Sequence, residues 1–192
     1  SDGVIYSGLP QGKLIAIAAE TGLFLWEVTF SSSGGLNEIE RIDDVTSKPV
    51  IDGSIIYVIS SSGNIAAIDR RSALVNWSRP LSSSHGFNLS ENSLVIVHET
   101  NSIYSLNNEA GKTNWKNEDL KYRNIGRGAI VGNYLVVGDF EGFLHFFNLN
   151  DGKLSNRIKM SGSQIIDNII VVNENKLIAT DVTGNIFLVS IN

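Results

Sequence analysis

A frame of glycine and tryptophan residues repeats along the chain and constrains its fold more than any other feature. Each frame starts at a Gly or Asn, has a Gly or Ala ten residues later and, in three copies, a Trp four residues after that. The frames begin at five positions: Gly12, Gly63, Asn101, Gly142 and, incomplete, Gly184. The Trp position is filled by Trp26, Trp77, Trp115 and, in the fourth copy, Asn156. Successive frames start 51, 38, 41 and 42 residues apart, so the chain consists of one structural unit used repeatedly.

Each frame follows a short apolar run rich in Ile, Val, Leu and Tyr. These runs cover residues 4–6, 55–59, 94–97, 134–137 and 176–179. A further apolar stretch precedes three of them, at 48–51, 129–131 and 169–172. Pairs of turn-forming residues separate the two, at 52–53, 132–133 and 174–175. The pattern predicts four short antiparallel strands in each unit and very little helix.

Four short strands in about 40 residues, repeated along a chain, describe the blade of a β-propeller. The predicted fold class is therefore all-β, with about four and a half blades over residues 1–192. A β-sandwich would keep neither a fixed period nor a fixed Trp. Because a blade buries its faces only against its neighbours, we expect the Trp of each unit to pack between adjacent blades.

The composition excludes several classes of function. The absence of Cys excludes disulfides, thiolate metal sites and Cys nucleophiles. A net charge of -5 with no basic stripe argues against a nucleic-acid partner. No apolar run reaches the roughly 18 residues that a membrane-spanning helix needs. The chain opens inside a strand pattern and has no signal peptide, so we expect it to be a piece of a longer protein.

Asp139 and Glu141 stand two residues apart at a predicted turn between strands. We expect Asp139 to cap this turn, and an acid–base pair or a cation site with Glu141 is the alternative. No His, Lys or Arg lies near Asp139 in the frame. The three histidines, His85, His98 and His145, fall in different units without the spacing of a zinc site, and we expect them at the surface or between blades. No catalytic residue and no cofactor site is predicted.

The longest insertion in the repeat, at about residues 31–48, accounts for the 51-residue spacing. It begins with a Ser/Gly stretch and continues with the charged residues Glu40, Arg41, Asp43 and Asp44. A long charged loop on a repetitive scaffold is a typical place for a binding surface. We therefore predict that these four residues bind a partner, and a solvated loop without a partner is the alternative.

The frame resembles the repeat of the pyrroloquinoline-quinone (PQQ) propeller superfamily. Two longer segments, 37–50 and 133–153, are similar to the BamB family of propeller lipoproteins, which serve the outer-membrane β-barrel assembly machine. The resemblance covers the whole chain and identifies it as a C-terminal fragment of such a protein. It implies an eight-bladed ring and a non-catalytic scaffold at the periplasmic face of the outer membrane of a Gram-negative bacterium. The lipid anchor and the first blades would precede residue 1.

The resemblance also implies partners, namely the POTRA domains of the barrel-inserting subunit BamA and unfolded outer-membrane proteins as clients. Asp44 matches an acidic residue that contacts the POTRA domain in this family. A second family acid is Thr46 in this chain, and a Leu- and Arg-bearing loop of the same patch would lie before residue 1. Family members close the ring with an N-terminal strand, so we expect an unpaired edge in the last blade.

Two other functions remain open from the sequence. A PQQ-dependent dehydrogenase shares the repeat, but such enzymes need a dense set of cofactor and calcium ligands, and many carry a vicinal disulfide. This chain has no Cys and no matching cluster of acidic and amide residues. A sensor or adhesin propeller is the third reading, because a fold by itself does not specify a function.

Overall fold

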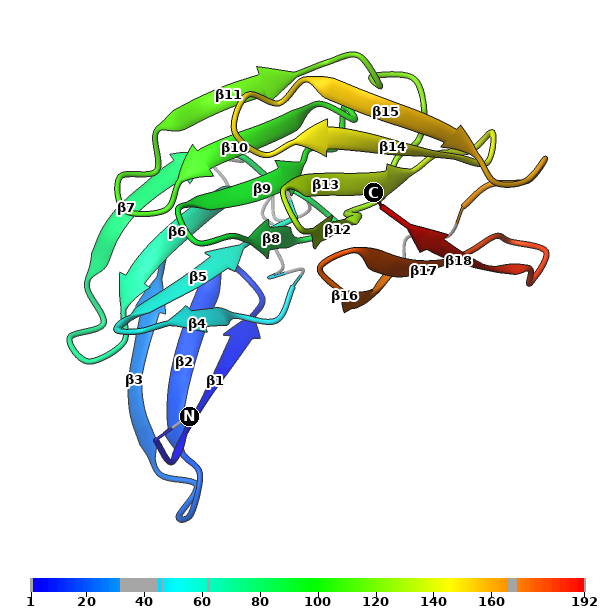
Figure 1. The fold of residues 1–192 in the computed structure, drawn as a ribbon. Coiled ribbons are helices and arrows are strands. Elements are labelled where there is room, and N and C mark those ends of the chain that lie inside the picture. Colours follow the sequence, from blue (N-terminus) through cyan, green and yellow to red (C-terminus); the bar gives the residue numbers. More distant parts are fainter. Residues whose placement is uncertain (1, 32–44, 46, 62, 166–168, 192) are drawn as a thin grey trace. The chain divides into compact units, whose positions relative to one another are not determined.

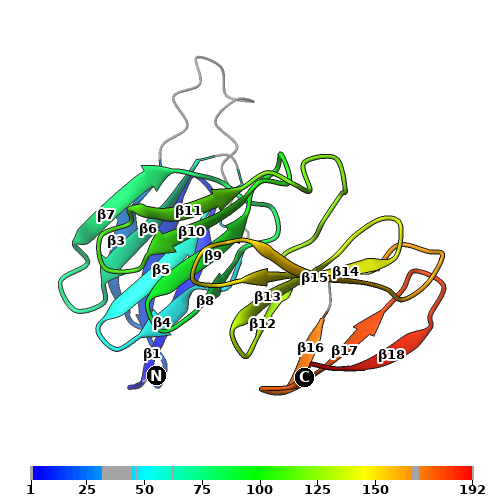
Figure 2. The same cartoon turned by 45° about the horizontal axis from the view of Figure 1, so that its top comes forward.

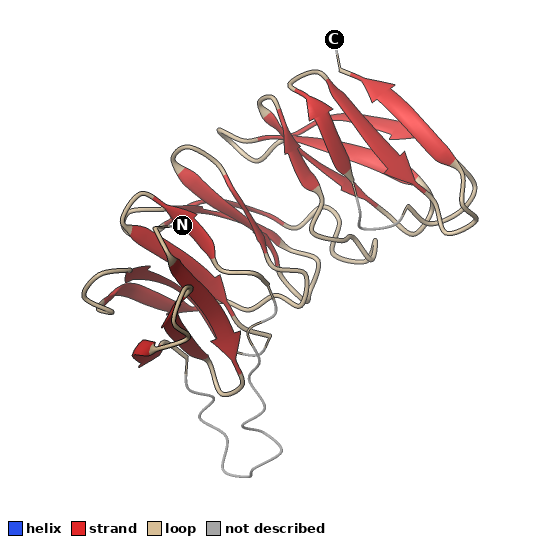
Figure 3. Ribbon diagram, turned by 90° about the horizontal axis from the view of Figure 1, so that it is seen from below, coloured by secondary structure: helices blue, strands red, loops and turns tan. Residues whose placement is uncertain are grey.

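The computed structural model describes residues 2–31, 45, 47–61, 63–165 and 169–191. Antiparallel β-sheets make up all the regular structure in these residues (Figure 3). No helix in these residues is long and apolar enough to span a bilayer. The chain forms two compact units, Ser1–Phe87 with Asn108–Lys112, and Asn88–Asn107 with Thr113–Asn192. The predicted all-β class is confirmed.

The first unit contains two sheets (Figure 1). One has the order β1 (Val4–Leu9), β2 (Lys13–Ala18) and β3 (Phe24–Thr29). The other has the order β4 (Val50–Asp52), β5 (Ile55–Ile59), β6 (Asn64–Asp69) and β7 (Val75–Pro80). Buried residues of both sheets form one core: Leu14, Phe30, Ile56, Val58, Ala66 and Ile68. Each sheet thus buries a face against the next, as expected for propeller blades.

The second unit holds most of a sheet in the order β11 (Thr113–Asn117), β10 (Ile103–Asn107), β9 (Ser93–Val97) and β8 (Phe87–Leu89). A four-stranded sheet follows, of β12 (Ala129–Val131), β13 (Tyr134–Gly138), β14 (Phe143–Asn148) and β15 (Leu154–Lys159), seen again in Figure 2. The last sheet contains β16 (Ile170–Asn173), β17 (Lys176–Thr180) and β18 (Ile186–Ser190). Among the described residues, β18 pairs with β17 alone. Of these strands β8 was not predicted, because its three residues include only two apolar ones.

Burial explains why the inner strands were easy to predict and the outer ones were not. All five residues of β9 and four of the five in β13 are buried. Such strands pack on both faces and therefore appear in the sequence as continuous apolar runs. The outermost strand β15 has five exposed residues out of six, so its sequence carries little hydrophobic signal.

The Trp residues occupy one register position in three blades. Each lies opposite a small residue of the neighbouring inner strand, and in the fourth blade Asn156 lies opposite a large one. The four pairs are Ala16 with Trp26, Ala67 with Trp77, Ser105 with Trp115, and Phe146 with Asn156. A β-bulge follows the inner-strand residue in every pair. The bulge is thus part of the repeat and aims the outer-strand side chain.

Each of two Trp rings contacts the turn of the following blade. The indole N–H of Trp77 donates to the carbonyl of Asn108 at 2.9 Å, and that of Trp115 donates to Leu149 at 2.7 Å. The rings cover Gly111 and Gly152, whose φ values are +66° and +69°. A Cβ on Gly111 would lie 2.7 Å from the Trp77 ring, and one on Gly152 would overlap Trp115. The Gly and Trp of the frame therefore meet across successive blades.

Gly152→Ala tests the contribution of this contact to stability. We expect the free energy of unfolding to fall by about 3 kcal/mol or more, because the new Cβ adds overlap with Trp115 to the cost of a positive φ. Gly22→Ala is the matched control, since Gly22 has the same φ of +69° and no atom within 4 Å of the added Cβ. It should cost about 1 kcal/mol. Equal losses in urea denaturation would contradict a role for the Trp contact.

The fourth blade reverses the size of the two side chains at the Trp position. Phe146 is buried and takes the place of the Ala or Ser, while Asn156 takes the place of Trp. Asn156 lines a cavity of about 360 Å³ together with Tyr134, Phe146, Ser190 and Ile191. We infer that the ring of Phe146 fills part of the space that an outer-strand indole fills in the other blades.

A double-mutant cycle at this pair checks the exchange. Phe146→Ala alone should cost about 3–5 kcal/mol by opening a cavity, and Asn156→Trp alone about 1–3 kcal/mol by overpacking. Combined, they restore the Ala–Trp pair of the second blade, so the double variant should lose about 1–2 kcal/mol less than the sum. Strict additivity of the two losses would show that the side chains do not share the space.

Candidate functional site

The turn between β13 and β14 holds a fully buried carboxylate, Asp139. Its Oδ1 accepts the backbone N–H of Glu141 at 3.0 Å and of Phe143 at 2.9 Å. Asp181 makes the same turn in the last sheet, where its Oδ1 accepts the N–H of Thr183 and of Asn185, each at 3.0 Å. A carboxylate at this position satisfies backbone donors that the tight turn leaves unpaired. Asp139 is therefore a turn cap, as the sequence predicted.

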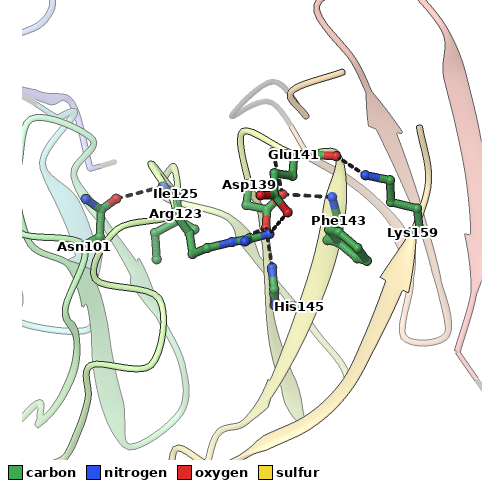
Figure 4. A network of polar contacts seen from close by, with 8 residues as sticks. All are labelled: Asn101, Arg123, Ile125, Asp139, Glu141, Phe143, His145 and Lys159. Atoms are coloured by element: carbon green, nitrogen blue, oxygen red, sulfur yellow. Dashed lines mark hydrogen bonds and ion pairs between the residues drawn. The ribbon is translucent and has the colours of Figure 1, made fainter. Parts of the chain in front are cut away.

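The other oxygen of Asp139 accepts hydrogen bonds from two basic side chains (Figure 4). Its Oδ2 lies 2.9 Å from Nε and 2.5 Å from Nη2 of Arg123, and 2.7 Å from Nε2 of His145. The expectation that no His or Arg lies near Asp139 is wrong. The register of β13 with β14 carries His145 back beside the turn, and Arg123 arrives from the loop before β12.

Of the three histidines expected at the surface or between blades, His145 is not at the surface. Its side chain is 1% exposed, and it bonds within its own blade. The signal for it was present in the sequence, because a strand that follows the turn after Asp139 must run back past it. Arg123 had no such signal, since it lies in a loop outside the repeat.

Burial and hydrogen bonds compete in setting the charges of this network. Burial by itself would raise the pKa of Asp139, but the bonds from His145, the Phe143 N–H and Arg123 outweigh it and hold this pKa below its usual range. Burial lowers the pKa of His145, and Arg123 and Arg157 lower it further, against the opposing effect of Asp139. The network thus pairs an ionised Asp139 with Arg123 and a neutral His145.

The loop that carries Arg123 is held at several points. Arg123 Nη2 also lies 2.8 Å from Oε2 of Glu141, and its carbonyl accepts the N–H of Phe140 at 3.1 Å. Two residues on, the N–H of Ile125 donates to Oδ1 of Asn101 at 2.8 Å. The buried charge of Asp139 therefore joins the loop to the β13–β14 turn, both within the second unit.

The chemistry available to the network is limited. His145 Nδ1 is buried and has no hydrogen-bond partner, so no hydroxyl or thiol stands where a nucleophile activated by this imidazole would stand. Across the part of the chain that the structure describes, no three His, Asp or Glu residues gather as a metal site. The arrangement suits a structural role, in which polar side chains hold a loop in place.

The predicted partner-binding residues Glu40, Arg41, Asp43 and Asp44 lie outside the described residues. Both ends of their loop are described. Ser31 Oγ accepts the N–H of Asn64 at 3.1 Å, and Val45 forms a β-bridge with Ser60. The ends of the insertion are therefore anchored to the second blade of the first unit.

Comparison with known proteins decides the family. The family model described as "Outer membrane protein assembly factor BamB" matches residues 1–117. The chain belongs to the BamB family. It is 30% identical to BamB of Yersinia pestis, over 92% of this chain and 45% of that protein, and 32% identical to BamB of Legionella pneumophila (strain Paris), over 84% and 42%. It thus spans somewhat less than half the length of these two relatives.

The crystal structure of BamB from Moraxella catarrhalis has the same fold. It superposes with a TM-score of 0.86 over 99% of this chain and 56% of that chain, at 24% identity. The β-propeller architecture predicted from the repeat is confirmed by this likeness.

The buried His145 should make stability depend on pH. Because its pKa is lower in the folded protein, the unfolded chain binds the proton first, so stability falls as the pH drops below about 6.5. His145→Gln keeps a donor for Asp139 and does not titrate. Between pH 7.5 and 5.5, the unfolding free energy of the His145→Gln variant should depend less steeply on pH than that of the unaltered protein. The difference in slope should be up to about 1.4 kcal/mol per pH unit. The same slope in both proteins, measured by urea denaturation, would contradict a neutral buried His145.

Proposed function

We propose that this chain acts as a non-catalytic scaffold in the assembly of outer-membrane proteins. The observation that carries the proposal is the match of the BamB family model to residues 1–117, a range that includes the whole insertion at 31–48. The relatives from Yersinia pestis and Legionella pneumophila bear the name of assembly factor. A scaffold needs binding surfaces and no chemistry, which agrees with the structural role of the Asp139 network.

The insertion is the proposed contact with the POTRA domains of BamA. Its charged residues Glu40, Arg41, Asp43 and Asp44 give it a net negative charge, and its ends are held by Ser31 and Val45. Val45 is partly buried and packs against the core of the first unit. Anchored ends reduce the conformational freedom that the loop loses on binding, which favours a binding role.

The name of the relatives, outer membrane protein assembly factor, supports a place of action at the outer membrane. We assign the protein to the periplasmic face of the outer membrane, held there by a lipid anchor on the longer protein. Unfolded outer-membrane proteins are the proposed clients. The matched relatives are named assembly factors, which favours a scaffold over a dehydrogenase and over a sensor or adhesin propeller.

Asp44→Arg in the full-length protein tests the contact. Charge reversal at the interface should weaken binding to purified POTRA domains by about tenfold or more. The measurement is a titration of the POTRA domains followed by biolayer interferometry, with co-purification as the qualitative counterpart.

Asp151→Arg provides the matched control, because Asp151 is also an acidic loop residue, in the turn between β14 and β15. It should leave the affinity unchanged. If Asp44→Arg binds as tightly as the unaltered protein, Asp44 is not a contact. If the unaltered protein shows no affinity for POTRA domains, the scaffold proposal itself fails.

A further inference from the structure

Three cationic side chains lie near the ring of Phe143 in the second unit, those of Arg123, Arg157 and Lys159. Figure 4 shows Arg123 and Lys159 beside this ring. Lys159 Nζ lies 4.3 Å from the ring centroid, and the guanidinium carbons of Arg157 and Arg123 lie 4.7 and 5.7 Å from it. Arg123 also lies 5.3 Å from the centroid of Phe140, which is 45% exposed. We call these five residues, Arg123, Phe140, Phe143, Arg157 and Lys159, the Phe143 surface.

The strand register creates this surface. Phe143 on β14 lies opposite Lys159 on β15, and His145 lies opposite Arg157. Partners across an antiparallel pair share a face, so Arg157 and Lys159 both extend beside Phe143. Because β15 is the outermost strand of its sheet, both of these side chains are exposed.

The positive charges of the surface are not balanced evenly. Arg123 is neutralised by Asp139 and Glu141. Arg157 and Lys159 form no ion pair with any carboxylate in the described part of the chain, although Lys159 donates to the carbonyl of Glu141. Two cations on one ring repel each other, and the ring face offsets this only in part. An anion at this place would remove the repulsion.

We propose that the Phe143 surface binds an extended acidic segment of a partner protein. Arg157 and Lys159 are two residues apart on one strand, about 7 Å, which equals the spacing of alternate side chains in an extended peptide. Two carboxylates at such spacing can each meet one cation. The exposed ring of Phe140, next to Arg123, offers apolar contact to neighbouring residues of the segment.

The charge of the whole chain favours a peptide over a larger anionic surface. The chain carries a net charge of -5, and Glu141 lies at the edge of the site. A lipid bilayer or a nucleic acid would bring many anionic groups against acidic residues elsewhere on the protein. A short segment can lie against the Phe143 surface alone. This inference does not rest on the proposed function, because it uses neither the insertion at 31–48 nor BamA.

The test uses a labelled peptide in which Glu alternates with Gly, and fluorescence anisotropy reports its binding to the protein. The peptide should bind, and Arg157→Glu combined with Lys159→Glu should weaken binding at least about tenfold. The neutral pair Arg157→Gln and Lys159→Gln should give an intermediate loss. Raising the salt concentration should weaken binding to the unaltered protein.

Lys153→Glu combined with Lys176→Glu is the matched control, because it makes the same change in net charge at two other exposed lysines of the second unit. It should keep most of the affinity. Equal loss in the control and the Arg157/Lys159 variant would mean a general charge effect and overturn the site. The site would also be overturned if a peptide in which Gln alternates with Gly bound as tightly as the Glu–Gly peptide. If vesicles of anionic phospholipid bind through Arg157 and Lys159 and the peptide does not, the choice of a protein segment is wrong.

Discussion

The contact between a Trp ring and the turn of the next blade is the interaction on which the repeat depends. Each blade is a small sheet that cannot bury both faces alone, so it needs a contact with the next blade that recurs in every repeat. The indole of Trp77 supplies apolar area to Gly111 and a hydrogen bond to the carbonyl of Asn108. Trp115 does the same at Gly152. This explains why glycine and tryptophan recur together in the sequence.

The Asp139 network shows how the scaffold carries a loop of irregular sequence. A buried carboxylate is costly unless donors surround it, and here two backbone N–H groups, Arg123 and His145 provide them. These hydrogen bonds connect the loop before β12 to the turn between β13 and β14, which recurs in the repeat. Arg123 then reaches across to Phe140 and Phe143. The hydrogen bonds that hold Arg123 at Asp139 thus also position it in the exposed Phe143 surface.

Two surfaces of opposite charge are placed on an otherwise repetitive framework. The insertion at 31–48 is acidic, and its ends are anchored in the first unit. The Phe143 surface is basic and aromatic and lies within the second unit. Neither follows from the repeat, which specifies the blades alone. Both proposed binding surfaces are therefore departures from the repeat.

The sequence by itself determined the fold class, the blades and the inner strands, because strands buried on both faces leave continuous apolar runs and the Gly–Trp contact leaves a fixed spacing. It also predicted the turn cap at Asp139, which needs only neighbouring backbone. Only the tertiary structure decided that Arg123 and His145 meet that carboxylate, and that the large side chain of Phe146 lies opposite Asn156. These contacts join residues distant in the chain, and such pairings depend on strand register and loop path.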